Sequence, residues 1–410
     1  MMKWKGRGYK AGLTRAAVRF IKKNIPYGIV YNAPRIAESF ANWLLKNTSK
    51  GFITPVYGLE HRVERPPEIY NHTVTTRFSK YFTRTIPPAF VAEIRGGSVY
   101  GEYTNAILPE RRVLAADLSR QFGAYGGLHP QQHVVLNATL KLPRPQYIKG
   151  RVAVITTSGA DNFHHWLYDC LPRIHQLKHS GKFETINYFL IAHAGQPFQL
   201  QSLERTGIDA SKIINPKKGG VPFYLADVLV VPSLPSPLGT VSPWVVEFLD
   251  NLFNPGSEKN SRFRKIYISR RNAPSRGIIN NDAFLTLLQR FGVEEIFPED
   301  YAVAEFAAIV ANAQFIISVH GSGLSNLCFA SEGAVVVDIL APWHQDSYYW
   351  MICNIRHARY IGFFSEGIHP ADDLDLVQYK VDDDMKVNLE DLEKLLLKEI
   401  GNYNEREAQN

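Results

Sequence analysis

The feature that most constrains the fold is an alternation of short apolar runs with amphipathic stretches between residues 265 and 340. The runs have the length and branched side chains of buried strands, and the stretches between them have helical periodicity. Strands joined through helices pair in parallel and are covered by helices on both faces. The pattern therefore predicts a doubly wound α/β domain with strands at 265–269, 293–297, 315–319 and 334–340 and helices at 281–291, 303–311 and near 324–330.

The same alternation begins near residue 151, whereas residues 50–150 hold short β-like runs interrupted by Gly, Pro and Asn. Such interruptions predict antiparallel or irregular structure. The polar stretch 254–262 is the best candidate for a linker. Strands are expected at 151–156, 188–192 and 227–231, with a helix at 197–206. The expected domains are a basic N-terminal segment at 1–50, a first domain at 51–253, a second domain at 263–385, and a C-terminal helix and tail at 386–410.

The composition fits two domains with substantial cores, since the 410 residues are 45% hydrophobic and 21% charged. The net charge of +7 arises largely at the N-terminus, where nine basic residues precede Glu38, the first acidic residue. Within this segment, residues 13–23 have the pattern of a basic amphipathic helix. Such a helix either binds an anionic membrane surface or packs on the protein itself.

The cellular location is also constrained. No apolar run is long enough to span a bilayer, and the N-terminus lacks the apolar core of a secretory signal. The cysteines, Cys170, Cys328 and Cys353, have no metal-ligand spacing and do not suggest a disulfide framework. We therefore expect a cytoplasmic protein, with residues 1–23 as a candidate peripheral contact to the inner face of the cell membrane. Nucleic acid is not an expected partner, because the basic tail has no groove-reading motif.

Residues 162–173 place amide, imidazole, indole, carboxylate and guanidinium groups at helical spacing. Apolar side chains occupy an adjoining sector, so one face can anchor the helix while the other lines a cleft. Pro172 interrupts or restarts this helix, which leaves the direction of Arg173 open. The alternative is a polar network that fixes a loop and a helix start. The polar stripe consists of Asn162, His165, Trp166, Asp169 and Arg173.

Two loops located directly after predicted strands suit a diphosphate, because ligands of open α/β sheets bind beyond the carboxyl ends of the strands. Residues 320–326 place two glycines before a helix start, whose free N–H groups favour an anion. Residues 270–276 contain three arginines, whose guanidinium groups match phosphate oxygens. A tight turn and ion pairs with Glu294, Glu295 or Glu299 are the alternatives. Neither loop has a three-glycine dinucleotide motif or a P-loop, which disfavours nicotinamide and ATP sites.

Metal binding is not expected. Asp-x-Asp patterns occur only at 373–375 and 382–384, in a polar stretch that is typical of turns. No cofactor is predicted from the other motifs either.

Three blocks in this order, Asn-x2-His-Trp-x2-Asp-x-Leu-Pro-Arg, Ile-Ser-Arg-Arg-x-Ala-x2-Arg and His-Gly-x-Gly-Leu-x-Asn, resemble glycosyltransferase family 61, including bacterial capsular-polysaccharide members. The resemblance spans roughly residues 90–365. It implies an α/β, GT-B-like fold with two Rossmann-like domains facing a cleft, here with a β-rich N-terminal portion. It also implies an inverting, metal-independent transfer from a nucleotide sugar, often UDP-linked, to a polysaccharide or glycolipid in cell-surface glycan biosynthesis. Ser322 and the pair Asn280-Asn281 depart from the residues that are common in the family.

The resemblance implies roles for individual residues. Inversion needs a base that takes the proton of the acceptor hydroxyl, and Asp169 is the first candidate for this base and His165 the second. Asn162, Trp166 and Arg173 are expected on the sugar and acceptor side. The residues expected to hold the donor are Arg270, Arg271, Arg276, His320, Gly321, Ser322, Gly323, Leu324 and Asn326. A non-catalytic nucleotide-sugar or glycan-binding module of the same fold is the alternative function, and a Rossmann-type oxidoreductase is a second enzymatic alternative.

Overall fold

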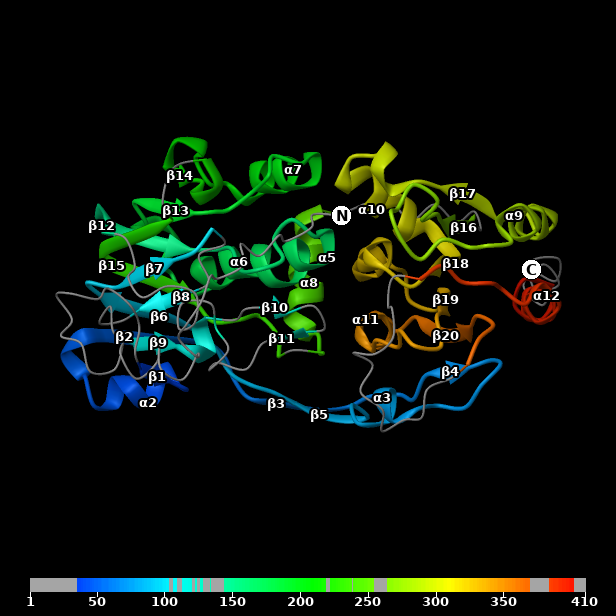
Figure 1. The fold of residues 1–410 in the computed structure, drawn as a ribbon, viewed down its shortest axis with the longest axis horizontal. Coiled ribbons are helices and arrows are strands. Elements are labelled where there is room, and N and C mark those ends of the chain that lie inside the picture. Colours follow the sequence, from blue (N-terminus) through cyan, green and yellow to red (C-terminus); the bar gives the residue numbers. More distant parts are fainter. Residues whose placement is uncertain are drawn as a thin grey trace, which may run out of the picture. The chain divides into compact units, whose positions relative to one another are not determined.

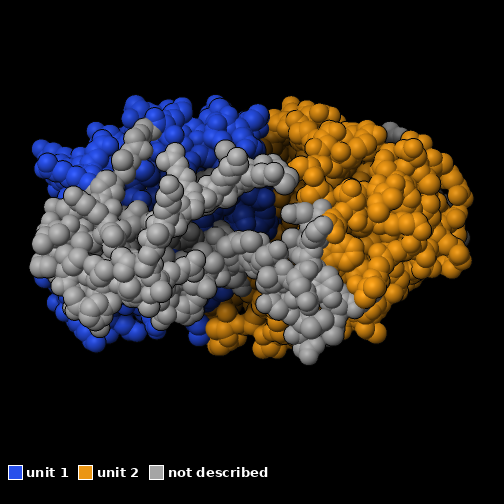
Figure 2. Space-filling model, viewed as in Figure 1, with its two compact units in different colours: residues 1–59, 87–238 blue, residues 60–86, 239–410 orange. Residues whose placement is uncertain are grey.

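The computed structural model describes residues 35–102, 106–108, 113–119, 122–123, 126–127, 133, 144–218, 222–237, 239–253, 264–368 and 383–401. The predicted basic helix at 13–23 and the Asp-x-Asp residues 373–375 lie outside these ranges, so the predictions on them stay predictions. Figure 1 shows the fold, and Figure 2 colours two compact units, each formed by two separate segments. Unit 1 is Met1–Leu59 with Pro87–Leu238, and unit 2 is Glu60–Ile86 with Gly239–Asn410.

Unit 1 is built on a mixed sheet of eight strands. Strands β14, β13, β12 and β15 are neighbours and run parallel, while β6, β7, β2 and β8 add antiparallel strands beyond β15. The central parallel strands β12 and β15 carry runs of buried aliphatic side chains, as expected of strands that are covered on both faces. In chain order the strands are β2 (Gly51–Tyr57), β6 (Ala89–Arg95), β7 (Ser98–Tyr100), β8 (Ala106–Leu108), β12 (Gln146–Val154), β13 (Tyr188–Leu190), β14 (Ile213–Ile214) and β15 (Phe223–Pro232).

The helices of unit 1 that matter for the site come after its parallel strands. Along the chain, β12 is followed by α5 (Phe163–His165), the π-helical turn η4 (Trp166–Cys170) and α6 (Leu171–His179). Strand β13 is followed by α7 (Pro197–Thr206). The helix predicted at 197–206 is thus confirmed, as is the strand and helix alternation from residue 151. The smaller elements are β1 (Arg35–Ala37), α2 (Phe40–Leu45), η1 (Thr48–Lys50), β9 (Val113–Ala115), η2 (Ala116–Leu118), β10 (Phe122–Gly123), β11 (Gly126–Gly127), η5 (Phe183–Thr185), η6 (Ala210–Lys212) and η7 (Pro216–Lys218).

Unit 2 is built on six parallel strands in the order β17-β16-β18-β19-β20-β4. Four of them are the strands predicted between residues 265 and 340, which confirms the parallel α/β prediction for this half of the chain. They are β16 (Arg264–Ile268), β17 (Glu294–Ile296), β18 (Ala313–Val319) and β19 (Val335–Leu340). Beyond the prediction, β20 (Arg359–Phe364) and the two-residue β4 (Glu68–Ile69) extend the sheet.

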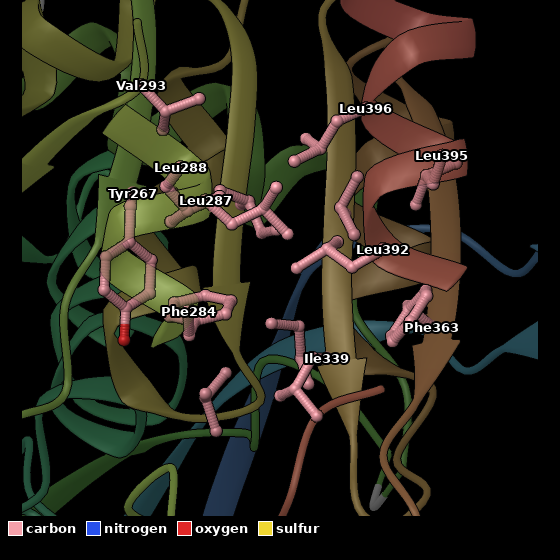
Figure 3. Close-up of a cluster of buried hydrophobic side chains, with 14 of the residues drawn as sticks. Tyr267, Phe284, Leu287, Leu288, Val293, Ile339, Phe363, Leu392, Leu395 and Leu396 are labelled. Atoms are coloured by element: carbon pink, nitrogen blue, oxygen red, sulfur yellow. The ribbon is translucent and has the colours of Figure 1, made fainter. Parts of the chain in front are cut away.

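One face of the unit 2 sheet holds a large hydrophobic cluster, shown in Figure 3. Side chains of α9 (Asn281–Arg290) and α12 (Leu389–Leu396) meet Tyr267 of β16, Ile339 of β19 and Phe363 of β20. Asn388 caps the start of α12, because its side chain accepts a hydrogen bond from the N–H of Asp391 at 3.0 Å. The remaining helices of unit 2 are α3 (Thr76–Ser79), α8 (Pro243–Phe253), η8 (Pro298–Asp300), α10 (Val303–Asn312), η9 (Ser322–Phe329), α11 (Tyr348–Ile355) and η11 (Leu397–Gly401).

The segment Glu60–Ile86 belongs to unit 2 although it precedes most of unit 1 in the chain. Its strands β3 (Glu60–Val63) and β5 (Thr83–Ile86) pair antiparallel, and β4 between them pairs with β20. Arg84 is buried; it bonds to Glu64 and donates to the carbonyl of Val241 at 2.7 Å. These contacts tie the segment to the residues that precede α8. Across the described parts of the chain, no helix combines the length and the apolar character that a membrane crossing requires.

Candidate active site

The first candidate segment comes after β12 and begins with a helix cap. The side-chain oxygen of Asn162 accepts hydrogen bonds from the N–H groups of His164 and His165, at 2.9 and 3.3 Å. An Asn in this position satisfies N–H groups that the start of a helix leaves unpaired. The Asn162 side chain thus has a structural role, while its predicted contact with a sugar stays a prediction.

The helix expected over 162–173 is divided by a π-helical turn. In η4 the N–H of Leu171 bonds to the carbonyl of Trp166, five residues earlier. Pro172 then lies in the first turn of α6, where the missing N–H is tolerated. A π turn adds a residue and rotates the next part of the helix, so a stripe drawn on one regular α-helix does not hold. The five polar residues consequently differ in exposure.

His165 and Asp169 form a hydrogen-bonded pair across this turn. Nδ1 of His165 lies 2.7 Å from Oδ2 of Asp169, and the side chains are 28% and 11% exposed. Gly159, at φ 92°, lies against the imidazole, because a Cβ at this position would come within 2.8 Å of the ring carbon Cδ2. The carboxylate and the glycine together fix the ring. This is the arrangement in which a carboxylate orients an imidazole for proton transfer.

Trp166 lies in the core of unit 1, which differs from the predicted sugar contact. The side chain is fully buried, and its Nε1–H donates to Oγ of Ser202 on α7 at 2.7 Å. The ring of Phe198 packs edge-on against it, with centroids 6.4 Å apart. A buried indole contributes a large apolar area and satisfies its N–H inside the protein. Trp166 therefore anchors the turn to α7.

Arg173 is also buried, with 1% of its surface exposed. Its guanidinium donates to the carbonyls of Ile155 and Thr156, at 3.1 and 3.2 Å, and twice to the carbonyl of Pro232, at 2.7 and 3.1 Å. It thus joins the carboxyl end of β15 to the residues directly after β12. This placement differs from the predicted acceptor contact, and we assign Arg173 a structural role.

Side-chain amides connect the loops after β12, β13 and β14. Gln199 donates to the carbonyl of Ala160 at 3.0 Å and accepts from the N–H of Ala194 at 3.0 Å. Asn215 holds the backbone of His193 from both sides, at 2.9 and 3.3 Å. His193 and Lys217, on these loops, lie outside the sequence prediction. Their positions directly after short apolar runs are the signal that could have found them.

In unit 2, the residues after β16 and β18 meet at Arg270 and Gly321. A Cβ at position 321 would lie 2.1 Å from Nη1 of Arg270, so only a glycine allows the guanidinium to rest on this backbone. Nη2 of Arg270 also donates to the carbonyl of Ser275 at 3.3 Å. Two of the predicted donor residues, one from each loop, are therefore in contact.

Arg276 and His320 form the second contact between the same loops. Arg276 has φ 60°, a conformation that is uncommon for residues other than glycine, and its Nη1 donates to the carbonyl of His320 at 2.8 Å. Nδ1 of His320 lies 2.8 Å from Oδ2 of Asp338, which also accepts from the hydroxyl of Tyr360 at 2.9 Å. Asp338 is fully buried and lies outside the sequence prediction. It fixes the ring of His320.

The other predicted donor residues occupy varied positions. Arg271 lies 3.6 Å from Glu295 and over the ring of Phe297, which is the ion pairing considered as the alternative. Gly323 lies against Ile268, since a Cβ there would come within 3.0 Å of its methyl group Cγ2. Ser322 is half-buried at the start of η9. Leu324 and Asn326 are buried, and Asn326 donates to the carbonyl of Gly323 at 2.9 Å.

Several buried polar atoms at this edge of the unit 2 sheet have no hydrogen-bond partner within the described part of the chain. They come after four different strands, β16, β18, β19 and β20. Buried polar groups are usually satisfied, so a group of orphans at the carboxyl ends of parallel strands is typical of a ligand site. The atoms are Nε of Arg276, Oδ1 of Asn326, Nε1 of Trp343 and Oγ of Ser365. Trp343 and Ser365 lie outside the sequence prediction.

Comparison with known proteins relates these loops to a family. Residues 163–337 match the family model described as Glycosyltransferase 61. The chain contains a glycosyltransferase family 61 domain. A rice protein (Oryza sativa subsp. japonica) named beta-1,2-xylosyltransferase XAX1 is 36% identical to the chain over 100 residues. The aligned segment covers 24% of this chain and 17% of the rice protein.

Proposed function

We propose that this family 61 domain transfers a sugar from a nucleotide-sugar donor to a glycan acceptor, with inversion at the anomeric carbon. The observation that carries the proposal is the matched range, because 163–337 contains the His165–Asp169 pair and both arginine and glycine loops of unit 2. The proposal includes the GT-B arrangement expected from the sequence. It also includes an acceptor that is a polysaccharide or a glycolipid.

The loops of unit 2 supply the groups that a nucleotide diphosphate requires. Arg270 rests on the backbone of Gly321, and Arg276 has an orphan Nε–H beside its bond to the His320 carbonyl. Guanidinium groups pair with phosphate oxygens and stabilise the negative charge that grows on the leaving diphosphate. In this proposal the two arginines supply that positive charge, so no divalent metal is needed.

The pair in unit 1 supplies the proton acceptor. With Asp169 bonded to Nδ1, the proton of the neutral imidazole resides on Nδ1 and the lone pair on Nε2. The imidazole is the more exposed of the two side chains. We therefore assign the base to His165 and the orienting role to Asp169, which reverses the order that the sequence favours. The attacking oxygen loses its proton to Nε2 as the bond to the anomeric carbon forms and the bond to the diphosphate breaks.

The donor is proposed to be a UDP-sugar. The name of the rice relative makes UDP-xylose the first donor to test, beside the UDP-hexoses. A donor screen by thermal shift is expected to show stabilisation by UDP-sugars over GDP-, CMP- and dTDP-sugars, because a ligand of the native state raises its stability. Transfer to a panel of oligosaccharides and methyl glycosides is then measured by mass spectrometry. EDTA is expected to leave the rate of transfer unchanged. Stabilisation without transfer or hydrolysis of any donor would favour the non-catalytic binding module instead.

Gly321→Ala is expected to raise the KM for the donor about 10- to 100-fold, because the added methyl group displaces a charged hydrogen-bond donor from the diphosphate. The rate at saturating donor is expected to fall as well, because the same guanidinium stabilises the charge that grows on the leaving diphosphate. Steady-state kinetics with varied donor measure both effects. Gly58→Ala is the matched control, since a Cβ at position 58 meets no atom of the described part of the chain within 4 Å. An unchanged donor KM in Gly321→Ala would contradict the assignment of the donor to these loops.

A further inference from the structure

The loops after β12, β13 and β14 in unit 1 carry polar groups that the proposed mechanism does not use. They are Asp161, which precedes the helix of His165, His193, which comes after β13, and Lys217, which comes after β14. Lys217 forms an ion pair with Asp161, and Glu102 lies 3.9 Å from the same ammonium group. Because β12, β13 and β14 run parallel, these groups lie at the carboxyl edge where α/β sheets bind ligands.

Hydrogen bonds between side chains and backbone hold the loops of His193 and Lys217 in place. Asn215 bonds to both the N–H and the carbonyl of His193, and the same side-chain oxygen accepts from the N–H of Lys217 at 3.1 Å. Thr156, just after β12, accepts from the N–H of Ala192 at 3.0 Å. The loop of His193 is thus bonded to both neighbouring loops. A site held by hydrogen bonds between its loops in this way needs little ordering when a ligand binds.

His193 has an unmet hydrogen-bonding capacity. Its Nδ1 is buried and lacks a partner among the residues that the structure describes, although the side chain as a whole is only half-buried. Burial, together with the charges of Lys218 and Lys217, lowers the pKa of the imidazole, and Asp161 opposes this effect. The ring is therefore neutral near pH 7, with one N–H donor and one acceptor nitrogen. Such a ring suits a hydroxyl group, which also donates and accepts.

We propose that His193 and the Lys217–Asp161 pair form the subsite that binds a sugar residue of the acceptor through its ring hydroxyls. The ammonium group donates to a hydroxyl oxygen, and the carboxylate accepts from a neighbouring hydroxyl. Since Asp161 offsets the charge of Lys217, the pair suits a neutral sugar better than a free anion. Asp161 lies four residues before His165, so the subsite adjoins the proposed base. This inference rests on the proposed glycosyltransferase function and names where its acceptor binds.

The test compares His193→Ala and Lys217→Met with the wild-type protein, using UDP-xylose or the best donor of the screen and the best acceptor of the glycoside panel. Each variant is expected to raise the acceptor KM about tenfold, as for the loss of one or two ligand hydrogen bonds. The donor KM and the slow hydrolysis of the donor without acceptor are expected to stay unchanged. His193→Asn, whose amide can replace Nδ1, is expected to recover part of the affinity.

His179→Gln is the matched control, because it removes an exposed imidazole at the far end of α6. An unchanged acceptor KM in both test variants would overturn the subsite while leaving the glycosyltransferase function intact. Equal losses of acceptor use, donor hydrolysis and thermal stability would also overturn it, because they indicate a purely structural role. A wild-type protein that neither transfers nor hydrolyses any donor would instead overturn the proposed function, and the subsite with it.

Discussion

His165→Ala is expected to lower kcat by about 10²- to 10⁴-fold, the range for the loss of a general base. The donor KM stays close to the wild-type value, because the donor is assigned to the loops of unit 2. Asp169→Asn is expected to lower kcat as well, since an amide at 2.7 Å from Nδ1 donates to it and shifts the imidazole proton to Nε2. The neutral ring would then have no lone pair for the acceptor hydroxyl. Initial rates of sugar transfer at saturating substrates measure both effects.

The control for this prediction is again His179→Gln, which removes an imidazole from the same stretch of helix without affecting the pair. Circular dichroism and thermal melting check that each variant is folded. If Asp169→Asn loses activity while His165→Ala keeps it, the base is Asp169, as the sequence favours. If both variants keep the wild-type kcat, neither residue is the base.

Arg173→Met is expected to lower the free energy of unfolding by about 3 kcal/mol or more, since it leaves three buried carbonyl groups without their donor. The methionine preserves most of the apolar stem, so the loss reports the hydrogen bonds more than the packing. The midpoint of urea unfolding, monitored by tryptophan fluorescence, measures the change. The stability of Arg173→Lys is expected to lie between those of the wild-type protein and Arg173→Met. One ammonium group cannot bridge the carbonyls at the ends of both strands as the guanidinium does.

Arg95→Met provides the matched control. Arg95 is exposed and, among the described residues, donates only a long bond of 3.4 Å to the carbonyl of Ser49, so its replacement is expected to change stability by less than about 0.5 kcal/mol. An Arg173→Met variant with unchanged stability and a raised acceptor KM would contradict the structural role. It would instead place Arg173 at the acceptor, as the sequence predicts.

Hydrophobic periodicity was sufficient to predict α7 in unit 1 and, in unit 2, the parallel strands from β16 to β19 with the helices between them. The helix at 197–206 and the strands at 265–340 have strong patterns, because each buries one face or both faces in a core. The short strand β4 could not be predicted in this way. It has two residues and gains its place by pairing with Ile361 and Gly362, far along the chain. The assignment of Glu60–Ile86 to unit 2 depends on the same long-range contacts.

The candidate site was predictable as a set of loops but not as a set of side-chain directions. The π turn, which no periodicity announces, coincides with the burial of Trp166 and Arg173 and leaves the His165 side chain 28% exposed. The partner of His320 was not found either. Asp338 lies within an apolar strand, and its carboxylate is bonded to His320 and Tyr360, which come from other parts of the chain. Such long-range contacts cannot be predicted from the local sequence.

The measurement that tests the proposed mechanism most directly is the product configuration and rate of sugar transfer from an α-linked UDP-sugar, monitored by proton NMR. We expect a β-linked product from the wild-type protein and its near loss in His165→Ala, with donor binding retained. A product with the α configuration, or equal rates of transfer in the two proteins, would contradict the mechanism.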